Sequence, residues 1–223
     1  MFPGTPRRFA MRFFLPPLVG FCSIGESVIF LDARSDRYWM LPVAMSQALN
    51  RQCAGAELAG NEAAPLTALV RVGLLDITKG EPLVPCELPR ARTSRLEVID
   101  TTPGSSTMIA GLCFAASTWR IRRRGLGCEL AGLQRRRERR CGTARDVDRH
   151  AGAFARLRLL VSPTGHCLPL SLALARRCAS ADARLVFGVQ LAPFAAHAWV
   201  QRDTEVLNDE LHVVHAFTPI LVI

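Results

Sequence analysis

Several features are missing from this 223-residue sequence, and each absence excludes a class of protein. No run approaches the roughly 18 uncharged apolar residues that a membrane-spanning helix needs. The eight cysteines form no CxxC pair, which argues against a cysteine-ligated zinc site and against a small disulfide scaffold. No GxxxxGK[ST] motif is present, so we expect no nucleotide site of the P-loop type. The balance of 49% apolar and 21% charged residues is typical of a globular chain.

The first residues imitate a signal peptide only in part. Arg7 and Arg8 precede an apolar stretch at 13–15, as in a signal peptide, but Arg12 and the proline pair at 16–17 interrupt it. No clear small-x-small cleavage site follows. We therefore expect a cytoplasmic protein without a membrane span, most of whose cysteines are reduced and act as small apolar residues.

The net charge of +9 is concentrated in one segment. Residues 119–149 hold eleven arginines and four acidic residues, a balance of +7. Clustered arginines bind phosphates, so an arginine-rich nucleic-acid-binding protein is one alternative. However, the segment lacks interleaved aromatics and matches no helix-turn-helix, RRM or zinc-finger pattern. We favour a solvated helical surface, or one that docks an acidic partner, and expect no nucleic-acid partner.

Residues 18–76 have the pattern of a small α+β unit. Two β-rich runs, at 28–31 and 37–41, flank the polar segment 32–36 and predict a hairpin, and residues 21–23 are a candidate third strand. Two helices are expected next, one opened by Pro42 and one by Pro65. Both have helical apolar spacing: Met45, Ala48, Leu49 and Cys53 in the first, and Leu66, Leu69, Val70 and Leu74 in the second.

The middle of the chain divides into a proline-rich segment and a long helical one. Prolines break up residues 77–105, and we predict a linker at 81–105. Residues 106–140 are predicted to be helical, with possible breaks at Gly125 and Gly127 and an apolar stripe of Met108, Leu112, Ala115 and Trp119. The expected organisation is thus 1–80, a linker at 81–105, and 106–223, in the α+β class.

The residues with catalytic potential lie near the C-terminal end. Cys167 follows a turn-like segment and opens a nearly all-apolar helix, where unpaired N–H groups and the helix dipole stabilise a thiolate. Strands are predicted at 184–189, 195–201 and 205–207, and the second carries His197. Asp209 follows the third strand and can lie beside His197 across a turn. A thiolate, an imidazole and a carboxylate are the parts of a Cys–His–Asp nucleophilic site.

Other polar residues in this region fit the chemistry less well. Asp203 is the rival acid, but it falls in the predicted turn. His166 flanks the nucleophile, yet its side chain need not face it. His212 and His215 would point to opposite faces of a strand, which is poor for a shared metal, so we expect no metal site. Trp199 shares a strand face with His197 and is expected to shield the His–Asp pair from water.

Two groups of motifs resemble known families. VIFLDARSDRYWMLPVAMSQAL and PLTALVRVGLLD resemble the precursor-recognition domain of ribosomally made, modified peptides, a winged-helix-like module similar to PqqD. HCLPLSLALARRC, ARLVFGVQLAPFAAHAWVQ and EVLND resemble the lasso-peptide leader peptidase, a transglutaminase-like, papain-related domain. Together the two halves resemble the fused B protein of lasso-peptide biosynthesis. One departure is Leu170, where the family often has arginine.

The resemblance implies a winged-helix-like recognition domain, built of a β-hairpin or three-stranded sheet plus helices, followed by a transglutaminase-like cysteine peptidase domain. It implies a catalytic triad at Cys167, His197 and Asp209. It also implies that the leader of a lasso precursor adds as an extra strand beside the hairpin. Since strand residues alternate between faces, only one of the pairs 38/40 and 39/41 can meet the peptide. The candidate leader-binding residues are Tyr38, Trp39, Met40, Leu41, Leu69 and Val70.

The activity implied by the resemblance is hydrolysis of the bond between leader and core. A separate asparagine-synthetase-like ligase would then use ATP to close the macrolactam. Because this chain has no recognisable cofactor motif, any need for ATP would arise through that ligase. Two alternatives remain: a non-catalytic precursor-binding chaperone that presents substrate to the ligase, and the nucleic-acid-binding protein above.

Overall fold

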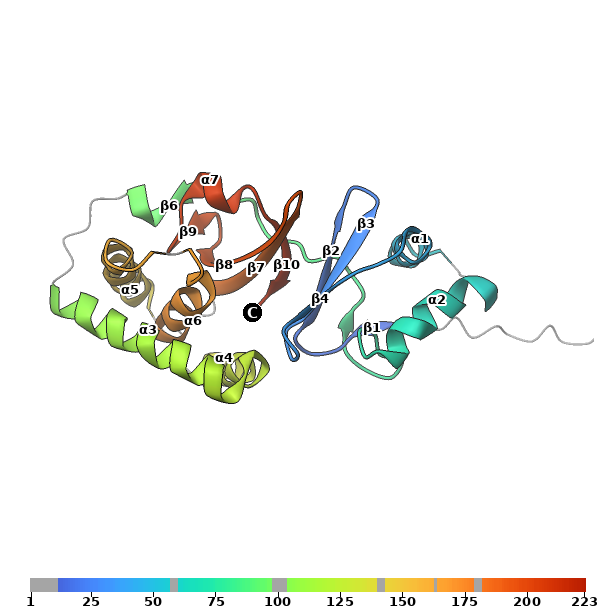
Figure 1. Ribbon diagram of the computed structural model, residues 1–223, viewed down its shortest axis with the longest axis horizontal. Coiled ribbons are helices and arrows are strands. Elements are labelled where there is room, and N and C mark those ends of the chain that lie inside the picture. Colours follow the sequence, from blue (N-terminus) through green and yellow to red (C-terminus); the bar gives the residue numbers. More distant parts are fainter. Residues whose placement is uncertain (1–11, 57–59, 98–103, 140–142, 163, 179–181) are drawn as a thin grey trace, which may run out of the picture.

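A computed structural model describes residues 12–56, 60–97, 104–139, 143–162, 164–178 and 182–223. The chain forms an elongated molecule in which an N-terminal sheet with two helices lies against a larger C-terminal α+β part (Figure 1). No helix within the described residues is both long enough and apolar enough to cross a membrane.

The N-terminal part is a three-stranded antiparallel sheet with helices on one face. Its strands are β2 (Val19–Ile24), β3 (Ser27–Asp32) and β4 (Arg37–Met40), in the order β2-β3-β4, which leaves β4 at one edge. The predicted hairpin and third strand are thereby confirmed. The helices α1 (Val43–Cys53) and α2 (Gly60–Arg71) cover a core that includes Phe21, Phe30, Leu49 and Leu66.

One expectation for this region is wrong. Pro65 lies inside α2 rather than opening it, because the φ angle of proline is already helical and only one backbone hydrogen bond is forfeited. The segment predicted as a linker, 81–105, contains three short regular elements in its described part. β5 (Glu81–Pro82) pairs with β1 (Phe14–Leu15), and β6 (Thr93–Ser94) joins the C-terminal sheet before the 3-10 turn Arg95–Glu97.

The C-terminal part is a five-stranded sheet packed against helices. The strand order is β10-β7-β8-β9-β6, with β7 (Ala183–Leu191) and β8 (Phe194–Arg202) as the long central pair. The shorter strands are β9 (Glu205–Val206) and β10 (Thr218–Val222), and the short helix α7 (Leu211–Val214) lies between them in sequence. The main helices are α3 (Gly104–Arg124), α4 (Leu126–Arg139), α5 (Ala144–Leu157) and α6 (Cys167–Cys178).

The predicted long helix is present, but its apolar stripe does not face the core. α3 and α4 are separated at Gly125, whose φ of +78° is a backbone conformation that favours glycine. α3 buries Ala110 and Ser117 instead, since small residues allow it to approach α5 and α6 closely. The stripe residues are exposed: Met108, Leu112, Ala115 and Trp119.

The two parts meet along a tightly packed seam. One apolar core includes Ile29 and Leu31 of β3 together with Leu130 of α4 and Ile220 of β10. A Cβ added to Gly20 would lie 2.3 Å from the carbonyl oxygen of Ile220, so only glycine fits there. The N-terminal sheet is thus covered on one face by its own helices and on the other by the C-terminal part (Figure 1).

Candidate active site

Cys167 is the first residue of α6, as the sequence predicts. The preceding Gly165 has a φ of +74°, which turns the chain into the helix, and Pro169 lies in the first turn, where a missing N–H costs nothing. The N–H of Leu170 donates to the carbonyl of His166 at 3.1 Å and begins the helical ladder. Residues 170–175 are buried, so α6 is fixed at the centre of the C-terminal part. The position of its first residue, Cys167, is therefore fixed as well.

His197 lies on β8, opposite Gly188 of β7. Aromatic rings flank its imidazole: Phe217 is stacked at a centroid distance of 4.9 Å and Trp199 at 6.2 Å. A Cβ at Gly188 would lie 2.7 Å from the Trp199 ring, so the glycine provides the room that this ring occupies. Trp199 itself is buried, and Phe217, which the sequence analysis missed, is the nearer ring.

Asp209 follows β9 and accepts three hydrogen bonds through its carboxylate. Its Oδ2 is 2.6 Å from Nε2 of His197. Its Oδ1 accepts from Nη1 of Arg158 at 2.7 Å and from the N–H of Glu210 at 2.8 Å. Since Nε2 is bound to the carboxylate, Nδ1 is the imidazole nitrogen that remains for Cys167, and His197 is close enough to lower the pKa of that thiol. The structure therefore brings Cys167, His197 and Asp209 together.

A second set of buried polar groups ties the three supporting segments to one another. Ser171, one helical turn after Cys167, donates from Oγ to the carbonyl of Ala198 at 2.8 Å. Asn208 donates from Nδ2 to the same Oγ at 2.8 Å and accepts from the N–H of Val200 at 2.7 Å. Each triad residue thus lies beside, or one turn from, a member of this network, which sets the spacing of α6, β8 and the loop after β9.

The charges at the site favour a thiolate and an imidazolium. Burial acts to raise the pKa of Cys167, but the hydrogen bond and charge of His197 and the N–H groups of Ala198 and Leu168 lower it below its ordinary value. Burial likewise acts to lower the pKa of His197, yet its bonds to Asp209 and Cys167 raise it to about 9. The pKa of Asp209 is lowered, against burial, by His197 and Arg158, so its carboxylate stays ionised.

These shifts give an expected order of reactivity among the cysteines. Burial raises the pKa of Cys86 to about 11 and that of Cys178 to about 12. Because the thiolate is the reactive form, we expect iodoacetamide at pH 7 to alkylate Cys167 at least about tenfold faster than Cys86, which is also half-buried. Peptide mass spectrometry would measure both rates. In a His197→Ala variant the advantage should disappear; equal rates in the unmodified protein would contradict a lowered Cys167 pKa.

The predicted leader-binding residues are divided among three environments. Leu41 and Leu69 are buried in the N-terminal core, and Val70 packs against it. Trp39 and Met40 are exposed on the edge strand, with 38% and 66% of their surface accessible. Tyr38 packs against the C-terminal part, where its ring meets Phe194 at a centroid distance of 5.5 Å. The strand positions that remain open are therefore those of Trp39 and Met40.

The rival acid and the flanking histidine lie apart from the triad contacts. Asp203 is exposed in the turn between β8 and β9, with a φ of +49°. His166 is exposed, and its ring contacts Phe114 edge-on at 5.7 Å.

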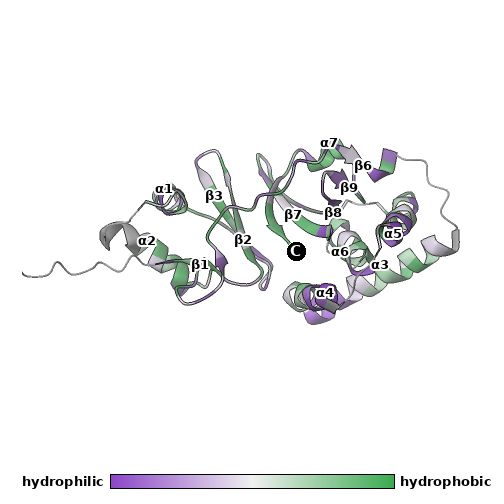
Figure 2. Cartoon of the chain, turned by 180° about the vertical axis from the view of Figure 1, so that it is seen from behind, coloured by the Kyte–Doolittle hydropathy of each residue, from purple (hydrophilic) through white to green (hydrophobic). Residues whose placement is uncertain are grey.

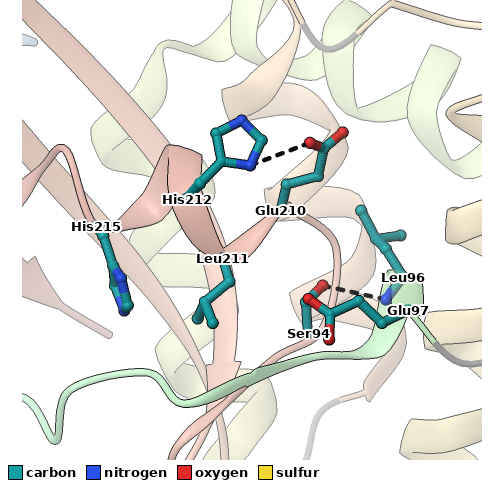
Figure 3. Close-up of a pocket in the computed structure, with 7 residues that line it drawn as sticks. All are labelled: Ser94, Leu96, Glu97, Glu210, Leu211, His212 and His215. Carbon is teal, nitrogen blue, oxygen red and sulfur yellow. Dashed lines mark hydrogen bonds and ion pairs between the residues drawn. The ribbon is translucent and has the colours of Figure 1, made fainter.

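The two C-terminal histidines are on α7 and at its end, so the strand expected for them is wrong. Both line a cavity of about 510 Å³ together with Ser94, Leu96, Glu97, Glu210 and Leu211 (Figure 3). His212 pairs with Glu210 at 3.4 Å, and Nε2 of His215 is 2.9 Å from the carbonyl of Ala91. Among the described residues no group of three or more His, Cys, Asp or Glu side chains is arranged to hold a metal ion.

The arginine-rich segment is divided between buried ion pairs and open surface. The side chain of Glu129 is 3% exposed, and it forms ion pairs with Arg120 at 3.4 Å and with Arg176 at 2.7 Å. Other arginines of the segment, at 122–124 and 135, are exposed, and α4 and α5 carry much of the hydrophilic colour in Figure 2. Part of the segment therefore anchors α3 and α4 to α6, and part forms a solvated basic surface.

Comparisons with known proteins identify the C-terminal part. Residues 111–222 match the sequence profile of the Transglutaminase-like superfamily, which spans half of the chain and the whole Cys–His–Asp constellation. The chain belongs to the transglutaminase-like superfamily. Searches of curated proteins and of solved structures returned no significant match.

Proposed function

We propose that this protein is a cysteine peptidase that binds the leader of a lasso precursor and hydrolyses the leader–core bond. The observation that carries the proposal is the contact chain from the Cys167 thiol through His197 to Asp209, on a transglutaminase-like domain. Membership of this superfamily is compatible with peptidase chemistry. The choice of a lasso precursor rests on the sequence resemblance described above.

In the proposed reaction His197 accepts the proton of Cys167, and the sulfur attacks the scissile carbonyl. The backbone N–H of Cys167 helps to stabilise the oxyanion, a type of contact worth ~3 kcal/mol. The carbon–nitrogen bond breaks, His197 protonates the leaving amine of the core, and the leader remains as a thioester. Water then adds to the thioester, frees the leader acid and returns the proton to Cys167.

The edge of the N-terminal sheet is suited to deliver the substrate. β4 begins at the seam, where burial and the nearby charges of Asp36 and Cys167 raise the pKa of Tyr38 to about 12. From there the strand continues to Met40, which is exposed. A peptide added antiparallel to β4 would run toward Tyr38, so its C-terminal end, where leader meets core, would approach Cys167. A parallel strand would place the wrong end of the leader there.

Incubation of the protein with a matching precursor tests this function. We expect two products whose masses add up to that of the precursor plus one water, measured by mass spectrometry. A precursor with a scrambled leader and an intact junction is the control and should be cut far more slowly. Tight binding of the precursor without cleavage, with and without the partner ligase, would favour the presenting chaperone instead.

A further inference from the structure

Arg158, at the end of α5, is the one cation other than His197 that contacts Asp209 within the described part of the chain. Its side chain is only 12% exposed and that of Asp209 is 4% exposed. We propose that Arg158 is a positioning residue that neutralises Asp209, so that the group orienting His197 carries no net charge. The proposal rests on the proposed role of the triad and adds to it a residue from outside the three motifs.

The two oxygens of the carboxylate contact different side chains. Oδ2 accepts from His197 at 2.6 Å, whereas Oδ1 accepts from Arg158 at 2.7 Å. The same Nη1 of Arg158 also donates to the carbonyl of Asn208 at 2.6 Å. The guanidinium thus holds both the carboxylate and the backbone just before it, and it fixes which oxygen faces the imidazole.

Neutralisation matters because His197 must release its proton as well as accept it. An unpaired carboxylate in a buried site would hold the imidazolium strongly and oppose protonation of the leaving amine. Thiol proteases of the papain type orient their histidine with a neutral asparagine. A paired Asp209 and Arg158 have the same net charge as that asparagine. Removal of either partner alone would leave an uncompensated buried charge.

Few other charges face this pair. The carboxylate of Glu210 lies 3.8 Å from Arg158, but it is 51% exposed and also pairs with His212. On the far side of the imidazole the facing titratable group is Cys167, which is in turn close to Tyr38. The charge balance behind His197 is therefore set mainly by Arg158 and Asp209.

The test is the pH dependence of Cys167 alkylation by iodoacetamide and of precursor cleavage. Arg158→Gln removes a cation, so the pKa values of Cys167 and His197 should both rise, and the profiles should move to higher pH by about one pH unit. Asp209→Asn removes an anion, so the profiles should move to lower pH. The double variant Arg158→Gln/Asp209→Asn restores the net charge and should return to within about half a pH unit of the unmodified protein.

Two control variants separate charge from structure. Arg158→Lys keeps the charge and should keep the profile while it lowers the maximal rate. Arg202→Gln removes a similarly half-buried arginine that pairs with Asp148 and Glu205, and it should leave the profile in place. Profiles that do not move in Arg158→Gln, or that move in the same direction in both single variants, would overturn the proposal. Because alkylation needs no substrate, an inactive unmodified protein would refute the proposed function without deciding this inference.

Discussion

Replacement of Cys167 by alanine is expected to abolish leader release, with a loss of about 10⁵-fold or more in cleavage rate. The reason is that no other group can form the thioester: in the proposed reaction His197 only transfers protons and Asp209 only orients it. Loss of a nucleophile in comparable triads removes nearly all catalysis beyond binding and oxyanion stabilisation. Product masses from a matched precursor would measure the effect.

Cys178→Ala is the matched control. Cys178 ends the same helix, is buried, and has a pKa raised to about 12 by that burial, so it has no thiolate near neutral pH. We expect cleavage by this variant to stay within about threefold of the unmodified rate, because only packing is altered. Cys167→Ala should still bind the leader. Equal cleavage by Cys167→Ala and unmodified protein would end the assignment of Cys167 as the nucleophile.

Local signals allowed much of the site to be predicted. A turn before Cys167 followed by an all-apolar run placed the cysteine at a helix start, and strand alternation placed His197 and Trp199 on one face. The turn at 202–204 is short enough to fix which residues pair across it, which brought Asp209 beside His197. Each of these features depends on residues that are close together in the sequence.

Features that depend on tertiary packing could not be predicted in the same way. Arg158 is 51 residues from Asp209, and Phe217 reaches His197 from the segment after α7, so neither has a local pattern that reveals its contact. The apolar stripe on α3 has helical spacing, but it is exposed rather than buried. Spacing predicts a helix, and it does not determine which face of that helix packs against the core. By contrast, α5 was missed although Thr143 and Asp146 form a capping box, a local signal that was available.

The second large expected effect is on leader affinity, and it follows from a substitution at the exposed edge of β4. The N–H of Leu41 donates to the carbonyl of Val28, so the antiparallel ladder turns the backbone groups of Met40 and Tyr38 away from β3 and toward the free edge. Met40→Pro removes one of these donors and leaves a leader carbonyl without its partner. We expect the dissociation constant of the leader to rise by about 10- to 100-fold. Fluorescence anisotropy of a labelled leader peptide would measure it.

Met40→Ala is the control for this experiment, because it removes the mostly exposed side chain and keeps the backbone N–H. Its affinity for the leader should stay within about threefold of the unmodified protein, while Cys167 alkylation should be unchanged in both variants. An equally large loss of affinity in Met40→Ala and in Met40→Pro would show that the side chain, and not strand addition, binds the leader. Equal leader affinity in all three proteins would show that the leader binds elsewhere. The proposal that β4 directs the leader–core junction toward Cys167 would then have no support.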